Sequence, residues 1–176
     1  CCMSVLDILT IPDKRLKHKS SEVLDFDEKL KKIVADMFDT LYASGNGIGL
    51  AAPQIGISKR IVVIDLREEG KQIQIVLINP KITSKSQENS INQEGCLSIP
   101  GYYADVERPN EINAEWSDLN GKKIKKKCSG LLSICVQHEI DHLDGILFTD
   151  YLSNLKRKRA LEKVKKYQKM QNEKIE

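Results

Sequence analysis

Two histidines and a glutamate, in the stretch QHEIDHLDG (137–145), are the residues of this chain with the clearest potential for chemistry. The chain holds only three histidines, and His138 and His142 stand four positions apart, with Glu139 directly after the first. On a helix, residues four apart share a face, so both imidazoles can bind one divalent metal ion. Glu139 then points to one side, where it can reach a water on that metal without being a ligand. This HExxH spacing predicts a metal site that activates water for hydrolysis.

A hydrolytic metal site of this kind needs a third protein ligand, and the chain offers several candidates. A histidine six positions after the second would be one, but that position is Phe148. His18 is distant in sequence, and a surface position is the more typical place for a lone histidine. Glu162 has suitable spacing, twenty residues after His142. It lies in a strongly basic segment, however, where a salt-bridging role is the alternative.

A thiolate is the remaining candidate for the third ligand. Cys96 lies in NQEGCLSIPG, between a glycine and a short apolar run, in a tight segment that can present one side chain inward. Cys128 and Cys135 are interpreted as small apolar fillers, as most buried cysteines are. Residue types and spacing alone therefore leave the third ligand open.

An apolar stripe leads up to the first histidine. Leu131, Ile134 and Cys135 lie seven, four and three residues before His138, so they share its helix face. Such a stripe is usually part of the core. Beside a metal, it also predicts the wall of a pocket for an unbranched apolar side chain such as methionine.

Helices and short strands must position these residues. The apolar spacing predicts a first helix over 27–43, started by Asp25 and stopped by Gly45, and the segment GNGIGLAAPQIG (45–56) is predicted to be a shaped loop. The later elements are predicted in order as strands at 60–66, 72–78 and 81–87, a hairpin of 111–118 with 122–128, a helix over 130–143 that carries the histidines, and a helix capped by Ser153. Because helices do not separate the strands, this order favours an α+β fold with antiparallel sheets.

Length and composition fit one soluble globular domain spanning residues 1–176. The chain is 40% hydrophobic and 30% charged, and it is long enough for a sizeable core. No apolar run approaches the ~18 residues of a membrane span, and no leader is visible, which favours the cytoplasm. Five cysteines without a framework spacing indicate reduced thiols. Cys1 and Cys2 precede Met3, and we interpret the pair as an added tail.

Three motifs, GIGLAAPQIG (47–56), EGCLS (94–98) and QHEIDHLDG (137–145), resemble in that order the signature motifs of the peptide deformylase family, bacterial type. The resemblance covers nearly the whole chain. It implies an α+β fold in which the helix with the histidines lies centrally among antiparallel β-sheets, with an N-terminal and a C-terminal helix. It also implies an activity, the removal of the formyl group from N-formylmethionyl peptides as new polypeptides are made.

The resemblance further implies roles for the motif residues. Cys96, His138 and His142 would bind one divalent metal ion, with Fe²⁺ expected in the cell and Ni²⁺, Co²⁺ or Zn²⁺ also able to occupy the site. Hydroxide on this metal would attack the formyl carbon, and Glu139 would be the general acid/base. Asp141 is interpreted as either a partner of a ligand histidine or a structural helix residue.

The substrate contacts that the resemblance implies come largely from the first two motifs. Gln54 and the backbone N–H of Leu97 match the positions that hold the formyl oxygen, and fixed donors of this kind are commonly worth ~3–4 kcal/mol each. The glycine-flanked segments are expected to hold the peptide backbone in a strand-like manner. The predicted substrate-binding residues are Ile48, Gly49, Glu94, Gly95, Leu131, Ile134 and Cys135.

The C-terminal segment is basic. Residues 156–176 hold nine Lys or Arg and three Glu, a net charge of +6, against +3 for the whole chain. One interpretation is a solvated helix that docks along a narrow apolar stripe. The other is that the helix over 153–176 binds the ribosome near the exit tunnel, as bacterial deformylases with such an extension are thought to do. The expected partners are formylated peptides and the ribosome, and no membrane.

Overall fold

The computed structural model describes residues 4–175, so the interpretation of Cys1 and Cys2 lies outside the described residues. Within this range the helices are α1 (Glu28–Ala43), α2 (Gly130–Leu143) and α3 (Asn154–Glu173). The strands are β1 (Gly49–Ala51), β2 (Ile61–Asp65), β3 (Gln74–Lys85), β4 (Asn89–Cys96), β5 (Ile99–Pro109), β6 (Glu111–Ser117) and β7 (Lys123–Ser129). Short 3-10 helices are η1 (Lys14–Lys17), η2 (Ala52–Ile55), η3 (Glu68–Gly70) and η4 (Phe148–Tyr151).

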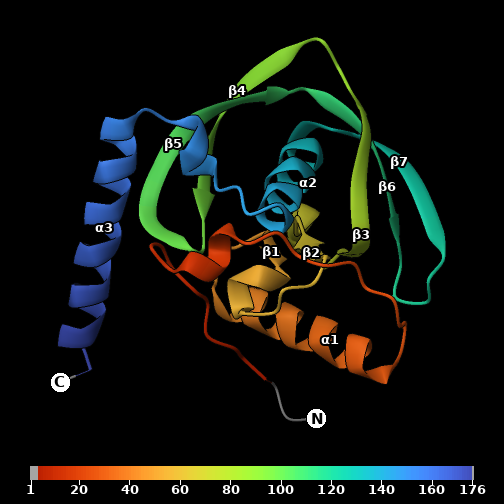
Figure 1. Ribbon diagram of the computed structural model, residues 1–176, viewed down its shortest axis with the longest axis horizontal. Coiled ribbons are helices and arrows are strands. Elements are labelled where there is room, and N and C mark those ends of the chain that lie inside the picture. The colour runs from red at the N-terminus through yellow and green to blue at the C-terminus, as the bar shows by residue number, and fades with distance from the viewer. Residues whose placement is uncertain (1–3, 176) are drawn as a thin grey trace.

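The strands form two antiparallel sheets (Figure 1). Five strands pair in the order β1-β2-β3-β6-β7, and β4 pairs with β5 in a separate hairpin. Every pairing between these strands is antiparallel. The predicted α+β class with antiparallel sheets is therefore confirmed.

The strand predicted at 81–87 is confirmed as strand as far as Lys85, but it is wrong as a separate element. Together with the strand predicted at 72–78 it forms β3, whose first half pairs with β2 and whose second half pairs with β6. The register shifts across Asn79 and Pro80, and Asn79 has a left-handed φ of 50°. A proline in a strand sequence indicates a break, but here it occupies a bulge that the strand passes through.

The β4–β5 hairpin has no clear signal in the sequence. β4 reads NSINQEGC, which lacks the apolar alternation that marks a half-buried strand. It is nevertheless paired with β5 along its length, up to the pair formed by Cys96 and Ile99. A tight turn at Leu97 and Ser98 joins the two strands. The hairpin therefore holds Cys96 at a fixed position beside the turn.

Strand β2 shows how the larger sheet holds helices on both faces. Side chains alternate along a strand, so Val62 and Ile64 pack in one core cluster with Val136 of α2, whereas Ile61 and Val63 pack in the cluster that includes α1. Helix α1 thus covers one face of the sheet and α2 the other, as the ribbon shows (Figure 1). Helix α2 is buried on nearly all sides from residue 135 to residue 143.

The N-cap residue of α1 lies two residues later than predicted. Asp27, not Asp25, accepts the hydrogen bond from the backbone N–H of Leu30, at 3.0 Å. The capping oxygen must reach an N–H of the first helical turn, and Asp25 is too far back for this. Gly45 ends the helix as predicted, with a φ of 86°. The predicted loop over 45–56 is partly regular, because it contains β1 and η2.

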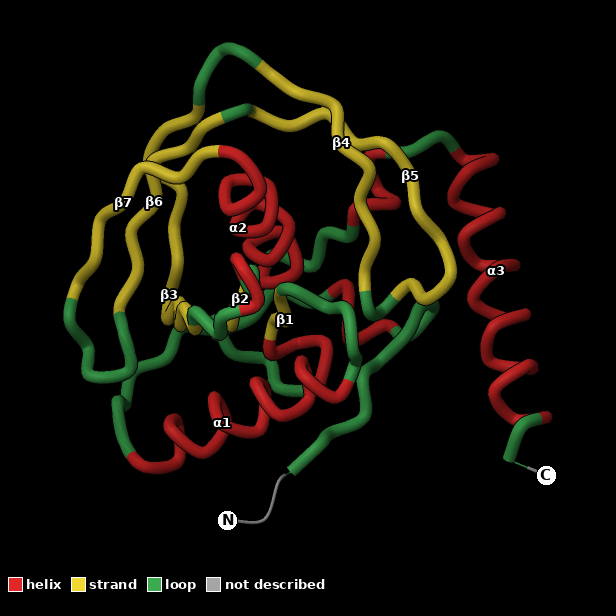
Figure 2. Tube along the Cα trace, turned by 180° about the vertical axis from the view of Figure 1, so that it is seen from behind, coloured by secondary structure: helices red, strands yellow, loops and turns green. Residues whose placement is uncertain are grey.

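Helix α3 is a peripheral element, seen at the edge of the molecule in Figures 1 and 2. It begins at the predicted cap Ser153, whose side chain accepts a hydrogen bond from the N–H of Lys156. It packs on β5, and its buried residues are Ala160 and Val164. Within the described part of the chain, the helices are all too short or too polar to span a membrane.

Candidate metal centre and active site

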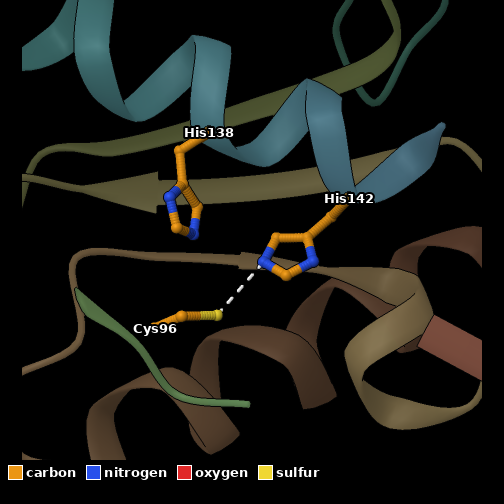
Figure 3. A group of neighbouring side chains, drawn as sticks. All are labelled: Cys96, His138 and His142. Atoms are coloured by element: carbon orange, nitrogen blue, oxygen red, sulfur yellow. Dashed lines mark hydrogen bonds between the residues drawn. The ribbon is translucent and has the colours of Figure 1, made fainter. Parts of the chain in front are cut away.

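The end of β4 and the second half of α2 bring three potential metal ligands together. The Sγ of Cys96 lies 3.2 Å from Nε2 of His142, and the ligand atoms of Cys96, His138 and His142 all lie within 4.8 Å of one another. Figure 3 shows the three side chains converging, the histidines from α2 and the cysteine from the strand end. Within residues 4–175, these three residues form the one group of three or more His, Cys, Asp or Glu side chains whose ligand atoms are close enough to hold a metal ion.

The donor set fits a small divalent cation. Bonds of ~2.3 Å to sulfur and ~2.0–2.1 Å to nitrogen, at tetrahedral angles, separate two ligand atoms by about 3.5 Å. The observed separation of 3.2 Å between Cys96 and His142 is close to this value. Three protein ligands leave one position of a tetrahedral site for water or substrate, which is the arrangement of catalytic centres.

The charges around the histidines also favour a cation. Burial alone would lower the pKa of His138, but contacts with Cys96 and Glu94 raise this pKa well above its ordinary value. His142 differs, because burial and the neighbouring His138 lower its pKa well below the ordinary value, so its imidazole is neutral. A metal ion would replace the positive charge that the negative groups around His138 already stabilise.

Glu139 is buried beside the ligand group. Among the described residues, no group donates a hydrogen bond to its Oε2. Burial raises the pKa of Glu139 to about 7, so the carboxyl can both accept and return a proton near neutral pH. Gly49 of β1 leaves room for it, since a Cβ there would lie 2.8 Å from Oε1 of Glu139 and 3.0 Å from Sγ of Cys135. A side chain at this position of β1 would therefore have to displace the Glu139 carboxylate or the Cys135 thiol.

Gln54 of η2 is held next to Cys96. Its Oε1 accepts a backbone N–H of β1 at 2.9 Å, its Nε2 donates to Oγ of Ser98 at 3.0 Å, and the same Nε2 lies 3.5 Å from Sγ of Cys96. Leu97 lies at the hairpin turn, and its side chain packs against Gly47. A Cβ on residue 47 would lie only 2.8 Å from the Leu97 side chain. The first two sequence motifs thus meet at the turn. The buried Ser98, which fixes the Gln54 amide, was not expected from the sequence.

Glu94 orients His138. Its Oε1 lies 2.8 Å from Nδ1 of His138, which leaves Nε2 of that ring for a metal. Arg108 of β5 donates to both carboxylate oxygens, from Nε at 2.6 Å and from Nη2 at 3.0 Å. Burial would raise the pKa of Glu94, but these partners lower it below the ordinary value, so the group is a carboxylate. The Glu94 side chain is thus engaged, and only its backbone is free for the predicted substrate contact.

Arg108 belongs to no sequence motif. It is a single arginine in a segment without recognisable periodicity, and nothing in the sequence pairs it with Glu94. Its importance appears only when β4 and β5 are side by side.

A groove lies between α2 and β4, along the stripe that leads to His138. Its volume is about 350 Å³, and its lining includes Leu131 and Ile134. Cys135 is buried against Gly49, and the half-buried Ile48 packs on the cluster that contains Cys135. The rest of the lining is mostly polar, which the sequence stripe does not reveal, and it consists of Ser90, Asn92, Asn110, Glu111, Ser129 and Gly130.

The other candidates for a third ligand lie apart from this site. His18 and Glu162 are both exposed, and neither belongs to the group of metal-binding side chains. Phe148, at the position where a third histidine would complete the longer motif, instead stacks on His138 with ring centroids 6.1 Å apart.

An α+β fold with a buried carboxylate beside a Cys-His-His group defines a hydrolase with a candidate metal centre. The family model described as polypeptide deformylase matches residues 5–158. The chain belongs to the peptide deformylase family, as the resemblance of its motifs predicts.

Individual relatives are similar over almost their whole length. A peptide deformylase of Zymomonas mobilis is 46% identical over 176 residues, covering 97% of this chain and 99% of the relative. Peptide deformylase 2 of Vibrio cholerae is 52% identical over 165 residues, covering 94% and 96%. The crystal structure of a peptide deformylase from Legionella pneumophila matches with a TM-score of 0.91 at 45% identity, covering 96% of this chain and 98% of that chain. That of Ehrlichia chaffeensis peptide deformylase, solved with actinonin, matches with a TM-score of 0.89 at 48% identity, covering 94% and 98%.

Proposed function

We propose that this enzyme hydrolyses the formyl group from the N-formylmethionine of new polypeptides in the cytoplasm, releasing formate and a free amino terminus. The observation that carries the proposal is the buried Glu139 carboxylate, with an oxygen that no described residue engages, beside the group of Cys96, His138 and His142. These three side chains would hold one divalent metal ion, with Fe²⁺ the metal in the cell and Ni²⁺, Co²⁺ or Zn²⁺ as substitutes.

The metal, when bound, would lower the pKa of a water molecule so that a nucleophile is available near neutral pH. Glu139 accepts the proton of that water and then delivers it to the leaving amine. The amide of Gln54 is held by β1 and Ser98, and its second N–H, which now faces Sγ of Cys96 at 3.5 Å, is the one that would donate to the formyl oxygen. The backbone N–H of Leu97, at the rigid hairpin turn, is the second donor.

The substrate would lie between the first two motifs. Residues 47–49, at the start of β1, and residues 94–96, at the end of β4, flank the site, so an extended peptide can pair with their backbones. Here Ile48, Gly49, Glu94 and Gly95 contribute main-chain groups. The methionine side chain would enter the groove beside Ile134 and Leu131, with Cys135 at its inner end.

Formate release from formyl-Met-Ala-Ser under anaerobic conditions is the direct test, with metal content measured on the same sample. We expect turnover in proportion to bound metal, abolished by a chelator and restored when metal is added. An enzyme that holds stoichiometric Fe²⁺ or Co²⁺ and releases no formate would refute the proposed reaction.

We also propose that α3 binds the ribosome through its basic face. The buried residues of the helix are Ala160 and Val164, and its lysines and arginines are exposed to solvent. Binding to RNA phosphates should weaken steeply as salt increases. Residues 160–176 would be deleted, and the truncated enzyme compared with the full chain in formyl-Met-Ala-Ser hydrolysis and in co-sedimentation with ribosomes at low salt.

The truncated enzyme should keep its short-peptide activity and lose ribosome binding. A charge variant, Lys165→Glu with Lys169→Glu, leaves the buried stripe intact and should show the same loss. Equal co-sedimentation of the full chain and both variants would mean that α3 is only a structural helix.

A further inference from the structure

The contacts around Glu94 and Arg108 continue away from the metal centre to the surface. Nη1 of Arg108 donates to Oδ2 of Asp141 at 2.9 Å, and the hydroxyl of Tyr151 donates to the same oxygen at 2.8 Å. The guanidinium carbon of Arg108 lies over the Tyr151 ring, 5.1 Å from its centroid. An unbroken chain of polar contacts therefore joins the ligand His138 to Tyr151, which is 53% exposed.

Tyr151 covers the outer end of a buried ion pair. The side chains of Arg108 and Glu94 are 5% and 4% exposed, and that of Asp141 is 18% exposed. Burial and the Asp141 carboxylate raise the pKa of Tyr151 to about 12, so its hydroxyl remains a donor at neutral pH. The Arg108 guanidinium lies under the Tyr151 ring, and the Asp141 carboxylate accepts two hydrogen bonds. Both groups therefore have little freedom to move.

The short helix η4, which carries Tyr151, also contacts His138 directly through Phe148. Phe148 and Tyr151 are the two ends of η4, three residues apart, so on a 3-10 helix they share one side. Phe148 stacks on the His138 ring at an interplanar angle of 28°. Asp150 of η4 accepts the N–H of Leu147 and pairs with Lys17, which ties the helix to η1.

We propose that Tyr151 and Asp141 are positioning residues for the metal ligand His138, acting through Arg108 and Glu94. They hold the guanidinium in one orientation, the guanidinium holds both oxygens of Glu94, and Glu94 fixes the proton of His138 on Nδ1 so that Nε2 faces the metal. This role rests on the metal-ligand set and not on the identity of the substrate.

Metal affinity and ligand geometry test the proposal without any reference to catalysis. Three variants would be compared with the parent chain: Tyr151→Phe removes the hydroxyl only, Tyr151→Leu also removes the ring, and Tyr167→Leu changes a comparably exposed tyrosine of α3 outside the chain of contacts. The affinity for Co²⁺ would be measured by competition with a chelator. The visible spectrum of the Co²⁺-loaded proteins would report ligand geometry, and thermal unfolding in chelator would report stability without metal.

Loss of a direct partner of a ligand histidine typically weakens metal binding ~10–100-fold, so this more distant position should have a smaller effect. We expect about threefold weaker binding for Tyr151→Phe and about tenfold for Tyr151→Leu, with a shifted Co²⁺ spectrum and no change for Tyr167→Leu. A Tyr151→Leu protein that melts earlier but binds Co²⁺ as tightly as the parent, with the same spectrum, would show a purely structural role. Equal losses in the Tyr167→Leu control would also overturn the proposal. If the parent chain binds Co²⁺ but releases no formate, the proposed reaction fails while the positioning role stands or falls on these affinities.

Discussion

Replacing Glu139 with glutamine should lower the rate of the proposed reaction and, in the metal-free protein, raise the free energy of unfolding. Glutamine has nearly the same shape, so it fits the space beside Gly49 without a new clash. It cannot accept a proton from water. General acid/base groups typically contribute ~10²–10⁴-fold to the rate, so the kcat for deformylation should fall by that factor while metal stays bound. Glu139→Ala should give the same loss with metal retained.

The same substitution should stabilise the metal-free protein, and the pH dependence can be worked out. Burial raises the pKa of Glu139 from the ordinary 4.5 to about 7 in the folded chain. The folded state therefore holds this proton more tightly than the unfolded state, and the stabilisation is complete below pH 4.5 and lost as the pH rises through 7. A shift of this size corresponds to roughly 3 kcal/mol at 1.36 kcal/mol per pKa unit. Glutamine does not titrate, so the variant keeps this stability at high pH.

Urea unfolding in chelator at pH 5 and pH 8 measures the difference directly. The two proteins should have similar free energies of unfolding at pH 5. At pH 8 the Glu139→Gln protein should be more stable by up to about 3 kcal/mol. A variant that is less stable than the parent at pH 8 would mean that burial of the Glu139 carboxylate does not destabilise the fold. Near-normal turnover with bound metal would mean that another group is the base.

Two further predictions concern the ligands and the groove. Cys96→Ala should lose metal affinity markedly, whereas Glu162→Ala, at an exposed position on α3, should not, and metal content after gel filtration distinguishes them; the reverse result would favour a glutamate-liganded centre. Formyl-methionine peptides should have a far higher kcat/KM than formyl-aspartate peptides, because a carboxylate in this groove would find no cationic partner among the lining residues and would lie near Glu111. Equal values for the two peptides would refute the placement of the side chain in this groove.

The part of the site that the sequence could predict is the part carried by one helix. His138, Glu139 and His142 are close in sequence, and helical geometry alone determines that they share a region of space. The choice of Cys96 as the proposed third ligand is not accessible to this reasoning, because Cys96 lies beside the histidines only through the pairing of β4 with β5. Only the resemblance of three separate motifs distinguished it from Glu162.

Long-range polar pairing accounts for most of what sequence reasoning missed. Arg108 matters because β5 places it beside Glu94, fourteen residues earlier, and beside Asp141, thirty-three residues later. The hairpin is not predicted from the sequence, because the face of β4 that points inward is polar. A polar segment is interpreted as a loop when its partners are unknown. Apolar periodicity finds elements that face a hydrophobic core, and it fails where a strand faces a site.

The charges gathered at this site explain why such a polar cluster can be buried next to the core. Glu94, Asp141 and Glu139 carry carboxylates, Cys96 supplies a thiolate when it binds a metal, and Arg108 is the cation that faces the first two. Without a metal, Arg108 and a protonated His138 offset only part of this negative charge, and uncompensated buried charge is strongly unfavourable. A divalent cation at the Cys-His-His group would remove most of the imbalance. A cation that serves the proposed chemistry would therefore also stabilise the folded chain. The two raised pKa values in this region have different causes, because burial raises that of Glu139 and the contacts with Cys96 and Glu94 raise that of His138.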